Sequence, residues 1–333
     1  MLVCVSTERG GCRNGRRLTG VLVSVLLTAG CTQASSGAPA ESSRATTPES
    51  TPEVSVTAEP LVAAVEVDLR AGIDAATAFG TSQGLSVSIA VIDRARGEEV
   101  ANGAAADTPI WGASLVKLFI ADNLLHRQRD GEFQLSAQDR SELESMLVAS
   151  DDVAADSLYT RFGGEAMVTE VAQRYQLPSV VPTNQAGFWE LTMMSARDVA
   201  RYYDRFLVRT PPADRDYLLD LLRRTAMIAI DGFDQFFGIP TALPAQTWAI
   251  KQGWMCCPRD TSYLHTTGVL GTDDRYVVAI LSSDPGVFST AYSTDVLSKV
   301  TSLIFPPGSI EGGETRRLSG TDSTLCTLQP AGD

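Results

Sequence analysis

Four polar residues of the types that acyl-transfer chemistry requires lie in three short stretches of the chain. Ser114 and Lys117 begin an apolar segment, and their i, i+3 spacing places both side chains on one face of a helix. A serine hydroxyl is a weak nucleophile, and a lysine accepts its proton only when burial or a second cation lowers the lysine pKa. Lys251 supplies such a cation, and Ser150 lies between the two lysines in the sequence. The residue types therefore predict a serine nucleophile with a lysine base.

Each stretch has a simpler interpretation when it is taken alone. Ser-x-x-Lys is common by chance, a serine followed by two aspartates usually caps a helix, and Lys-Gln-Gly carries little information. The order and spacing carry the hypothesis instead, because Ser150 lies 36 residues and Lys251 lies 137 residues after Ser114.

The three stretches together resemble the motifs of the serine β-lactamases and penicillin-binding proteins. Ser114-Leu115-Val116-Lys117, Ser150-Asp151-Asp152 and Lys251-Gln252-Gly253 are similar to Ser-x-x-Lys, Ser-Asp-Asn and Lys-Thr-Gly in that family. The resemblance covers residues 60–306 and is strongest to class A β-lactamases and to actinobacterial lipoproteins of the LppW type. It implies an α+β fold of the β-lactamase/transpeptidase type, with a five-stranded antiparallel sheet flanked by helices and an all-α insert.

The resemblance also implies a role for each matching residue. Ser114 is expected to be the acylated nucleophile and Lys117 its proton acceptor. Ser150 is expected to pass a proton to the leaving nitrogen, and Lys251 to provide positive potential for a substrate carboxylate. The backbone N–H groups of Ser114 and Trp254 are expected to stabilise the oxyanion.

Three positions depart from the family pattern. Asp152 replaces an asparagine that donates to the substrate, and a carboxylate accepts only, so it would repel a carboxylated substrate or pair with Lys117. Gln252 replaces a hydroxyl residue that helps to bind the carboxylate, whereas Gly253 keeps the close backbone approach. Glu190, in a Trp-Glu pair, is the candidate general base for deacylation, with a surface or structural carboxylate as the alternative. Without such a base an acyl-enzyme would persist.

The N-terminal region predicts export and lipid attachment. Residues 1–30 combine basic residues with an apolar run over 18–27, which is too short to span a bilayer. Small residues precede Cys31 as in a bacterial lipobox, and an ordinary secretory signal is the alternative. Residues 31–59 are rich in Ser, Thr, Pro, Ala and Glu and predict a disordered tether. We expect an anchor on the extracytoplasmic side of the cell membrane, a folded domain over 60–306 and a tail over 307–333.

The cysteines that would remain after processing are odd in number. Cys256, Cys257 and Cys326 lie beyond the expected signal segment and the lipidated Cys31. In an oxidising compartment this count predicts one disulfide and one free thiol. We expect Cys326 to pair with Cys256 or Cys257, and three reduced thiols are the alternative.

Hydrophobic periodicity predicts helices at both ends of the domain, strands near both ends and a helical middle, which together make one antiparallel sheet with a helical insert. The expected helices are 61–79, 114–129, two or three within 135–175, 195–209, 214–228 and 288–304. The expected strands are 86–92, 98–103, 248–251, 263–269 and 275–282.

Composition excludes several classes of function. A net charge of −13 disfavours nucleic acid as a partner. The chain has only two histidines, His126 and His265, which are too few ligands for a His-rich zinc site and leave few candidates for the base of a Ser-His-Asp triad. No metal and no cofactor is expected. We predict a serine hydrolase acting on β-lactams or D-alanyl peptides of peptidoglycan. The alternatives are a catalytically degenerate protein of the same fold that binds peptidoglycan or a protein partner, and a purely structural lipoprotein.

Overall fold

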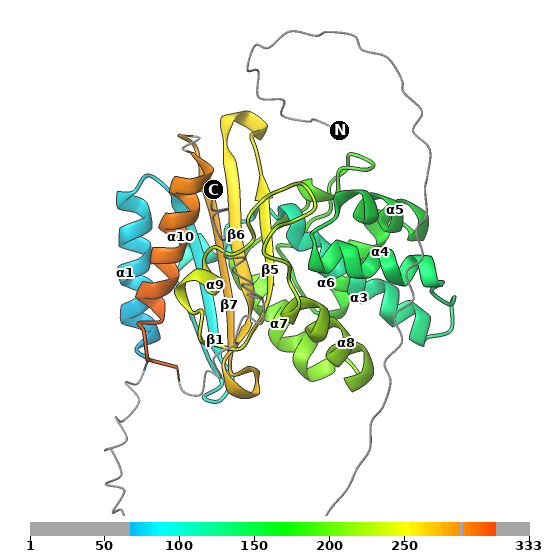
Figure 1. Cartoon of the computed structure of the whole chain (residues 1–333), viewed down its shortest axis with the longest axis horizontal. Coiled ribbons are helices and arrows are strands. Elements are labelled where there is room, and N and C mark those ends of the chain that lie inside the picture. The colour runs from blue at the N-terminus through cyan, green and yellow to red at the C-terminus, as the bar shows by residue number, and fades with distance from the viewer. Residues whose placement is uncertain (1–66, 287–288, 311–333) are drawn as a thin grey trace, which may run out of the picture. The chain divides into compact units, whose positions relative to one another are not determined.

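A computed structural model describes residues 67–286 and 289–310 of the chain (Figure 1). The expected signal segment and tether, with Cys31, lie outside the described residues, as does the tail from residue 311 onward. None of the helices in the described part has both the length and the apolar character that a membrane crossing requires.

One five-stranded sheet with antiparallel neighbours forms the centre of the domain, in the order β2-β1-β7-β6-β5 (Figure 1). Strands from the beginning of the domain therefore pair with strands from its end, as the sequence predicts. The strands are β1 (Ser86–Asp93), β2 (Glu98–Ala101), β5 (Trp248–Met255), β6 (Ser262–Leu270) and β7 (Tyr276–Asp284). β5 is an edge strand of this sheet, and the residues around Ser114 pack against it.

Helices cover both faces of the sheet. On one face, α1 (Leu69–Ser82) packs against α10 (Thr290–Ile304), and on the other face α7 (Ala196–Arg209) contacts β1 and β7 (Figure 1). Along β1, Ile89 belongs to the core beneath α1 and Ala90 to the core beneath α7. This strand is buried on both faces, which explains why its sequence is almost continuously apolar.

The remaining helices form the insert that the sequence predicts, and the region 135–175 holds three of them. They are α3 (Val116–Arg129), α4 (Ala137–Val148), α5 (Asp152–Phe162), α6 (Glu165–Arg174) and α8 (Pro212–Arg223). Four short elements were not predicted from the sequence: α2 (Ala104–Asp107), β3 (Ile110–Trp111), β4 (Met193–Met194) and α9 (Ile239–Ala242).

The predicted helix 214–228 is wrong at its C-terminal end. α8 ends at Arg223, and the N–H groups of Ala226 and Ile230 donate to the carbonyls of Val148 and Ala149 at 2.9 Å. These N–H groups thus bond to residues 148–149 instead of to the preceding turn of α8. Residues 226–235 instead form a small hairpin, closed by a bridge between Ile228 and Asp234.

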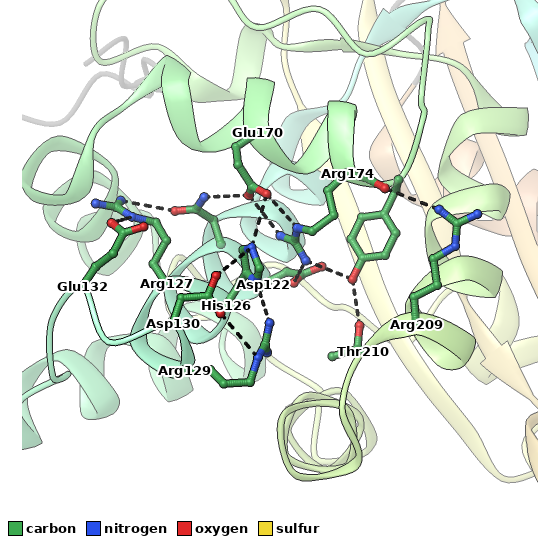
Figure 2. Close-up of polar contacts among 12 residues, drawn as sticks. Asp122, His126, Arg127, Arg129, Asp130, Glu132, Glu170, Arg174, Arg209 and Thr210 are labelled. Carbon is green, nitrogen blue, oxygen red and sulfur yellow. Dashed lines mark hydrogen bonds and ion pairs between the residues drawn. The ribbon is translucent and has the colours of Figure 1, made fainter.

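A buried polar network holds α3 against α6 (Figure 2). Arg174 Nη1 donates to Asp122 Oδ1 at 2.8 Å, and its Nε donates to Glu170 Oε1 at 2.7 Å. Glu170 also accepts from Asn123 at 2.9 Å. Burial raises the pKa of Asp122. Because Asp122 and Lys117 lie on the same helix, this network fixes the helix that carries the predicted base.

The expected disulfide pairing is wrong. Cys256 and Cys257 are bonded to each other, and they follow directly on the last residue of β5. With Cys256 and Cys257 joined to each other, neither is left to pair with Cys326, which lies outside the described residues.

Gly268 on β6 tests how closely β5 and β6 approach. A Cβ at this position would overlap the carbonyl oxygen of Ala249 and lie 3.0 Å from Ile250 Cα. We expect Gly268→Ala to lower the free energy of unfolding by about 2 kcal/mol, because backbone atoms must move. Ser262→Ala, on the same strand, is the matched control. Equal urea midpoints for the two variants would contradict this packing.

Candidate active site

Ser114 lies in a 3₁₀ turn, Ala113–Leu115, that leads directly into α3. Its side chain is almost fully buried. The preceding residue, Ala113, has φ +48°, and Ser150 has φ +53°. A left-handed backbone costs a non-glycine residue of order 1–3 kcal/mol, and such outliers concentrate at functional sites. One of them precedes the predicted nucleophile and the other is Ser150 itself, so two strained backbone positions belong to this site.

Lys117 contacts Ser114, Ser150 and Asp152, three of the polar residues that the sequence placed near it. Its Nζ lies 3.0 Å from Ser114 Oγ, 3.2 Å from Ser150 Oγ and 2.7 Å from the Ser150 carbonyl oxygen. Nζ also lies 2.6 Å from Asp152 Oδ1 and 4.9 Å from the centre of the Trp189 ring. The side chain has no exposed surface. Burial lowers the pKa of Lys117, and Asp152 opposes that change.

Lys251 joins the same cluster from the sheet. Its Nζ donates to Ser150 Oγ at 2.8 Å and to the Gln252 carbonyl at 3.1 Å. Burial lowers the pKa of Lys251 well below its ordinary value, and the neighbouring Lys117 lowers it further. The Ser150 hydroxyl therefore bridges two buried lysine amines. A hydroxyl suits this position because it can accept from one amine and donate to the other.

The two aspartates after Ser150 have different roles. Asp151 caps α5, because its Oδ1 accepts from the N–H groups of Val153 and Ala154 at 2.9 and 3.1 Å. The helix-cap interpretation is thus correct for Asp151. Asp152 pairs with Lys117, as the sequence suggested, and 65% of its side chain is exposed.

Gln252 does not take the predicted substrate-binding position. Successive residues of a strand point to opposite faces, so Lys251 and Gln252 cannot both face the cluster. Gln252 is fully buried, and its Nε2 donates to the carbonyls of Gln235 and Phe237 at 3.0 and 2.7 Å. Both amide hydrogens are used, which leaves no donor for a substrate. The prediction for this side chain is corrected to a structural role.

Gly253 has the role in close packing that the sequence suggested. A Cβ there would lie 3.1 Å from the Gly112 carbonyl oxygen and 3.0 Å from His265 Cδ2. The glycine thus lets β5 approach the backbone just before Ser114.

The hairpin over 226–235 is a part of the site that the sequence analysis missed. Trp254 Nε1 donates to Asp231 Oδ2 at 3.0 Å, and the Trp254 ring stacks on Phe233 at 4.4 Å between ring centres. The ring centre of Trp254 lies 5.7 Å from Lys251 Nζ. The hairpin therefore contacts both the residues before Ser150 and the strand of Lys251. The Asp231-Gly232 turn was the only signal in the sequence for it.

Glu190 lies in a 3₁₀ turn, Trp189–Leu191, that packs against the turn of Ser114. Trp189 is fixed there, because its Nε1 donates to Asp156 Oδ1 at 2.7 Å. Burial raises the pKa of Glu190, and the carboxylates of Asp156 and Asp152 raise it further. A carboxyl with a raised pKa, in a turn that packs against the turn of Ser114, is a candidate for a general base or acid.

His265 positions the site without taking part in it. This buried ring donates from Nε2 to the Trp111 carbonyl at 2.8 Å, and its Nδ1 accepts from the Ser282 N–H at 3.3 Å. Burial lowers the pKa of His265 to about 4, so the ring is neutral near pH 7. It ties β6 to the residues immediately before Ser114. Among the described residues no three His, Cys, Asp or Glu side chains gather as metal ligands.

Comparison with known proteins establishes the family. A family model described as the β-lactamase enzyme family matches residues 140–305, a range that includes Ser150 and Lys251 and begins after Ser114. The protein named "Putative lipoprotein LppW" in Mycobacterium tuberculosis is 41% identical over 266 residues, which are 78% of this chain and 82% of that protein. The chain belongs to the LppW family. The LppW protein of Mycobacterium bovis matches to the same extent.

Solved structures show that this LppW-family chain has the β-lactamase fold. PBP-A is 19% identical, with a TM-score of 0.59 over 70% of this chain and 94% of that one. A class A β-lactamase from Mycobacterium abscessus is 18% identical, with a TM-score of 0.57 over 70% of this chain and 97% of that one. The predicted fold class is therefore confirmed.

Asp152 opposes the effect of burial on the charge of Lys117. Its carboxylate favours the ammonium form of Lys117, so Asp152→Asn should lower the Lys117 pKa and increase the share of free amine at pH 7. NMR titration of the lysine side-chain signals measures this change. Asp295→Asn, an exposed substitution on α10, is the control. An unchanged or higher Lys117 pKa in Asp152→Asn would contradict the ion pair.

Proposed function

We propose that this chain is a serine acyl hydrolase that acts on β-lactams or D-alanyl peptides through an acyl-Ser114 intermediate. The observation that carries the proposal is the 3.0 Å contact between Ser114 Oγ and Lys117 Nζ, in a cluster where burial lowers the lysine pKa. A lowered pKa increases the share of the free amine, which is the form that accepts the serine proton.

The reaction follows from the contacts of the cluster. Ser114 Oγ attacks the carbonyl carbon while its proton passes to Lys117 Nζ. The backbone N–H groups of Ser114 and Trp254 receive the oxyanion. When the C–N bond breaks, the Ser150 hydroxyl gives its proton to the leaving nitrogen and takes one from a neighbouring amine, since its Oγ lies 3.2 Å from Lys117 Nζ and 2.8 Å from Lys251 Nζ.

Hydrolysis of the acyl-enzyme requires a base for water, and Glu190 is our candidate. Its raised pKa and its position beside the turn of Ser114 support this role. If Glu190 cannot activate water, the acyl group stays on Ser114. A solved structure of a PBP-A variant is an acyl-enzyme complex with penicillin G, so this fold can hold such an intermediate in that protein.

We further propose that the protein is exported and anchored to the cell membrane through a lipid on Cys31. The naming of the LppW relatives as lipoproteins supports this location. Peptidoglycan would then lie within reach of the folded domain.

A second candidate function is a binding protein that has lost catalysis. It is favoured by the pairing of Asp152 with Lys117, which opposes loss of the Lys117 proton, and by the enclosed side chain of Gln252. Peptidoglycan or a protein partner would be its ligand.

Intact-mass spectrometry separates the two candidates. We expect the protein to gain the mass of one penicillin or cephalosporin, and Ser114→Ala to gain none, because the acylated hydroxyl is absent. Ser82→Ala, on α1 across the sheet from the site, should behave like the unmodified protein. If no β-lactam or D-alanyl ester forms an adduct at any time, the enzyme proposal is wrong and the binding role is favoured.

Glu190→Gln tests deacylation separately. Removing the carboxylate should slow loss of the adduct about 100-fold or more, the size expected for a general base, with acylation changed much less. The decay of the adduct mass after removal of free drug measures this rate. Equal decay in both proteins would show that Glu190 is not the base.

A further inference from the structure

The buried lysines offer little positive charge to a substrate. Lys251 has lost its contact with water, and its Nζ donates to Ser150 and to the Gln252 carbonyl. Burial and Lys117 both lower its pKa. Lys117 is already paired with Asp152. A carboxylate entering the site would therefore meet weakened or neutralised cations.

The other donors that could bind a carboxylate in place of the lysines are held by neighbouring groups. Both amide hydrogens of Gln252 go to backbone carbonyls on the other face of the strand. Arg259, a guanidinium in the β5–β6 connection, stacks over the Trp111 ring at 5.3 Å. It stands beside the segment that leads to Ser114, whereas Asp152 lies at the start of α5.

Asp152 presents an acceptor where the family pattern has a donor. Oδ1 contacts Lys117 at 2.6 Å, no contact involving Oδ2 is seen among the described residues, and the side chain is 65% exposed. A carboxylate oxygen accepts hydrogen bonds only, so it binds an N–H group and opposes a carbonyl or carboxylate.

A second carboxylate acts on the same cluster from the hairpin 226–235. Asp231 is exposed and is held by Trp254 Nε1 at 3.0 Å, and its charge raises the pKa of both Lys117 and Lys251. Asp151 also raises the pKa of Lys117, and Asp156 and Asp152 raise the pKa of Glu190. The charged groups that act on the two lysines, other than the lysines themselves, are therefore carboxylates, whereas the exposed guanidinium of Arg259 lies beside Trp111.

We propose that the substrate is an acyl donor that carries an ammonium group, which the Asp152 carboxylate binds beside the scissile carbonyl. The inference rests on the proposed function and names its substrate class. A substrate ammonium also competes with Lys117 for Asp152. Binding of this substrate thus weakens the ion pair that favours the charged form of Lys117, and the substrate promotes the proton transfer that acylates Ser114.

Three matched thioesters test the inference. Each is an acetyl-X-D-alanyl thioester of an uncharged thiol, with lysine, Nε-acetyl-lysine or glutamate as X. Attack by Ser114 forms the acyl-oxygen bond, breaks the carbon–sulfur bond and releases the thiol with the serine proton. Thiol release gives kcat/KM, and intact mass reports acyl-Ser114. We expect the lysine compound to react about tenfold faster than its acetylated form, the size of one charge-assisted hydrogen bond, and the glutamate compound to react slowest.

Two variants identify the carboxylate responsible. Asp152→Asn should remove the preference for lysine over Nε-acetyl-lysine, whereas Asp74→Asn, an exposed substitution on α1, should keep it. Added salt should reduce the preference in the unmodified protein, because the Asp152 carboxylate is exposed. Equal rates for the three compounds, or a preference that survives Asp152→Asn, would overturn the inference and leave the proposed function intact. If no compound acylates Ser114, the inference is overturned, and the β-lactam adduct measured by intact mass then decides the proposed function on its own.

Discussion

Two buried lysine side chains share one serine hydroxyl, and the arrangement of the active site depends on this contact. Lys117 comes from a helix and Lys251 from an edge strand, and Ser150 Oγ lies 3.2 Å from one Nζ and 2.8 Å from the other. Two like charges so close together are unfavourable, and burial adds a desolvation cost to each. The surrounding fold must supply the energy that holds them. The same burial places an amine with a lowered pKa next to Ser114.

The supporting groups act mainly through the backbone. His265 bonds to the carbonyl of Trp111, Gly253 allows the Gly112 carbonyl to approach β5, and the N–H groups of Ala226 and Ile230 bond to the chain just before Ser150. Each contact fixes a main-chain segment on one side of the cluster. The left-handed residues Ala113 and Ser150 persist because these contacts hold the segments on both sides.

The sequence predicted the sheet and the cluster well, because both depend on patterns that sequence carries directly. The alternating and continuous apolar runs of β1 and β7 locate the central strands, and the order of Ser114, Ser150 and Lys251 locates the cluster. Gln252 was misplaced because a motif match ignored strand alternation, which the sequence also contains. The hairpin 226–235 was missed since its bonds run to residues about 80 positions away, and Cys257 was misassigned since its neighbour Cys256 is its partner.

The cluster also spans the boundary between the two structural layers. Ser114, Lys117 and Ser150 belong to the helical insert and its connections, whereas Lys251 belongs to the sheet, and the Ser150 hydroxyl closes the gap between them. A shift of about 1 Å between the layers would break that bond while leaving every helix and strand intact. The chemistry is therefore sensitive to how the insert packs on the sheet. Correct secondary structure does not by itself show that the active site is assembled. Distant substitutions that loosen the packing of the insert on the sheet would produce a folded but inactive protein.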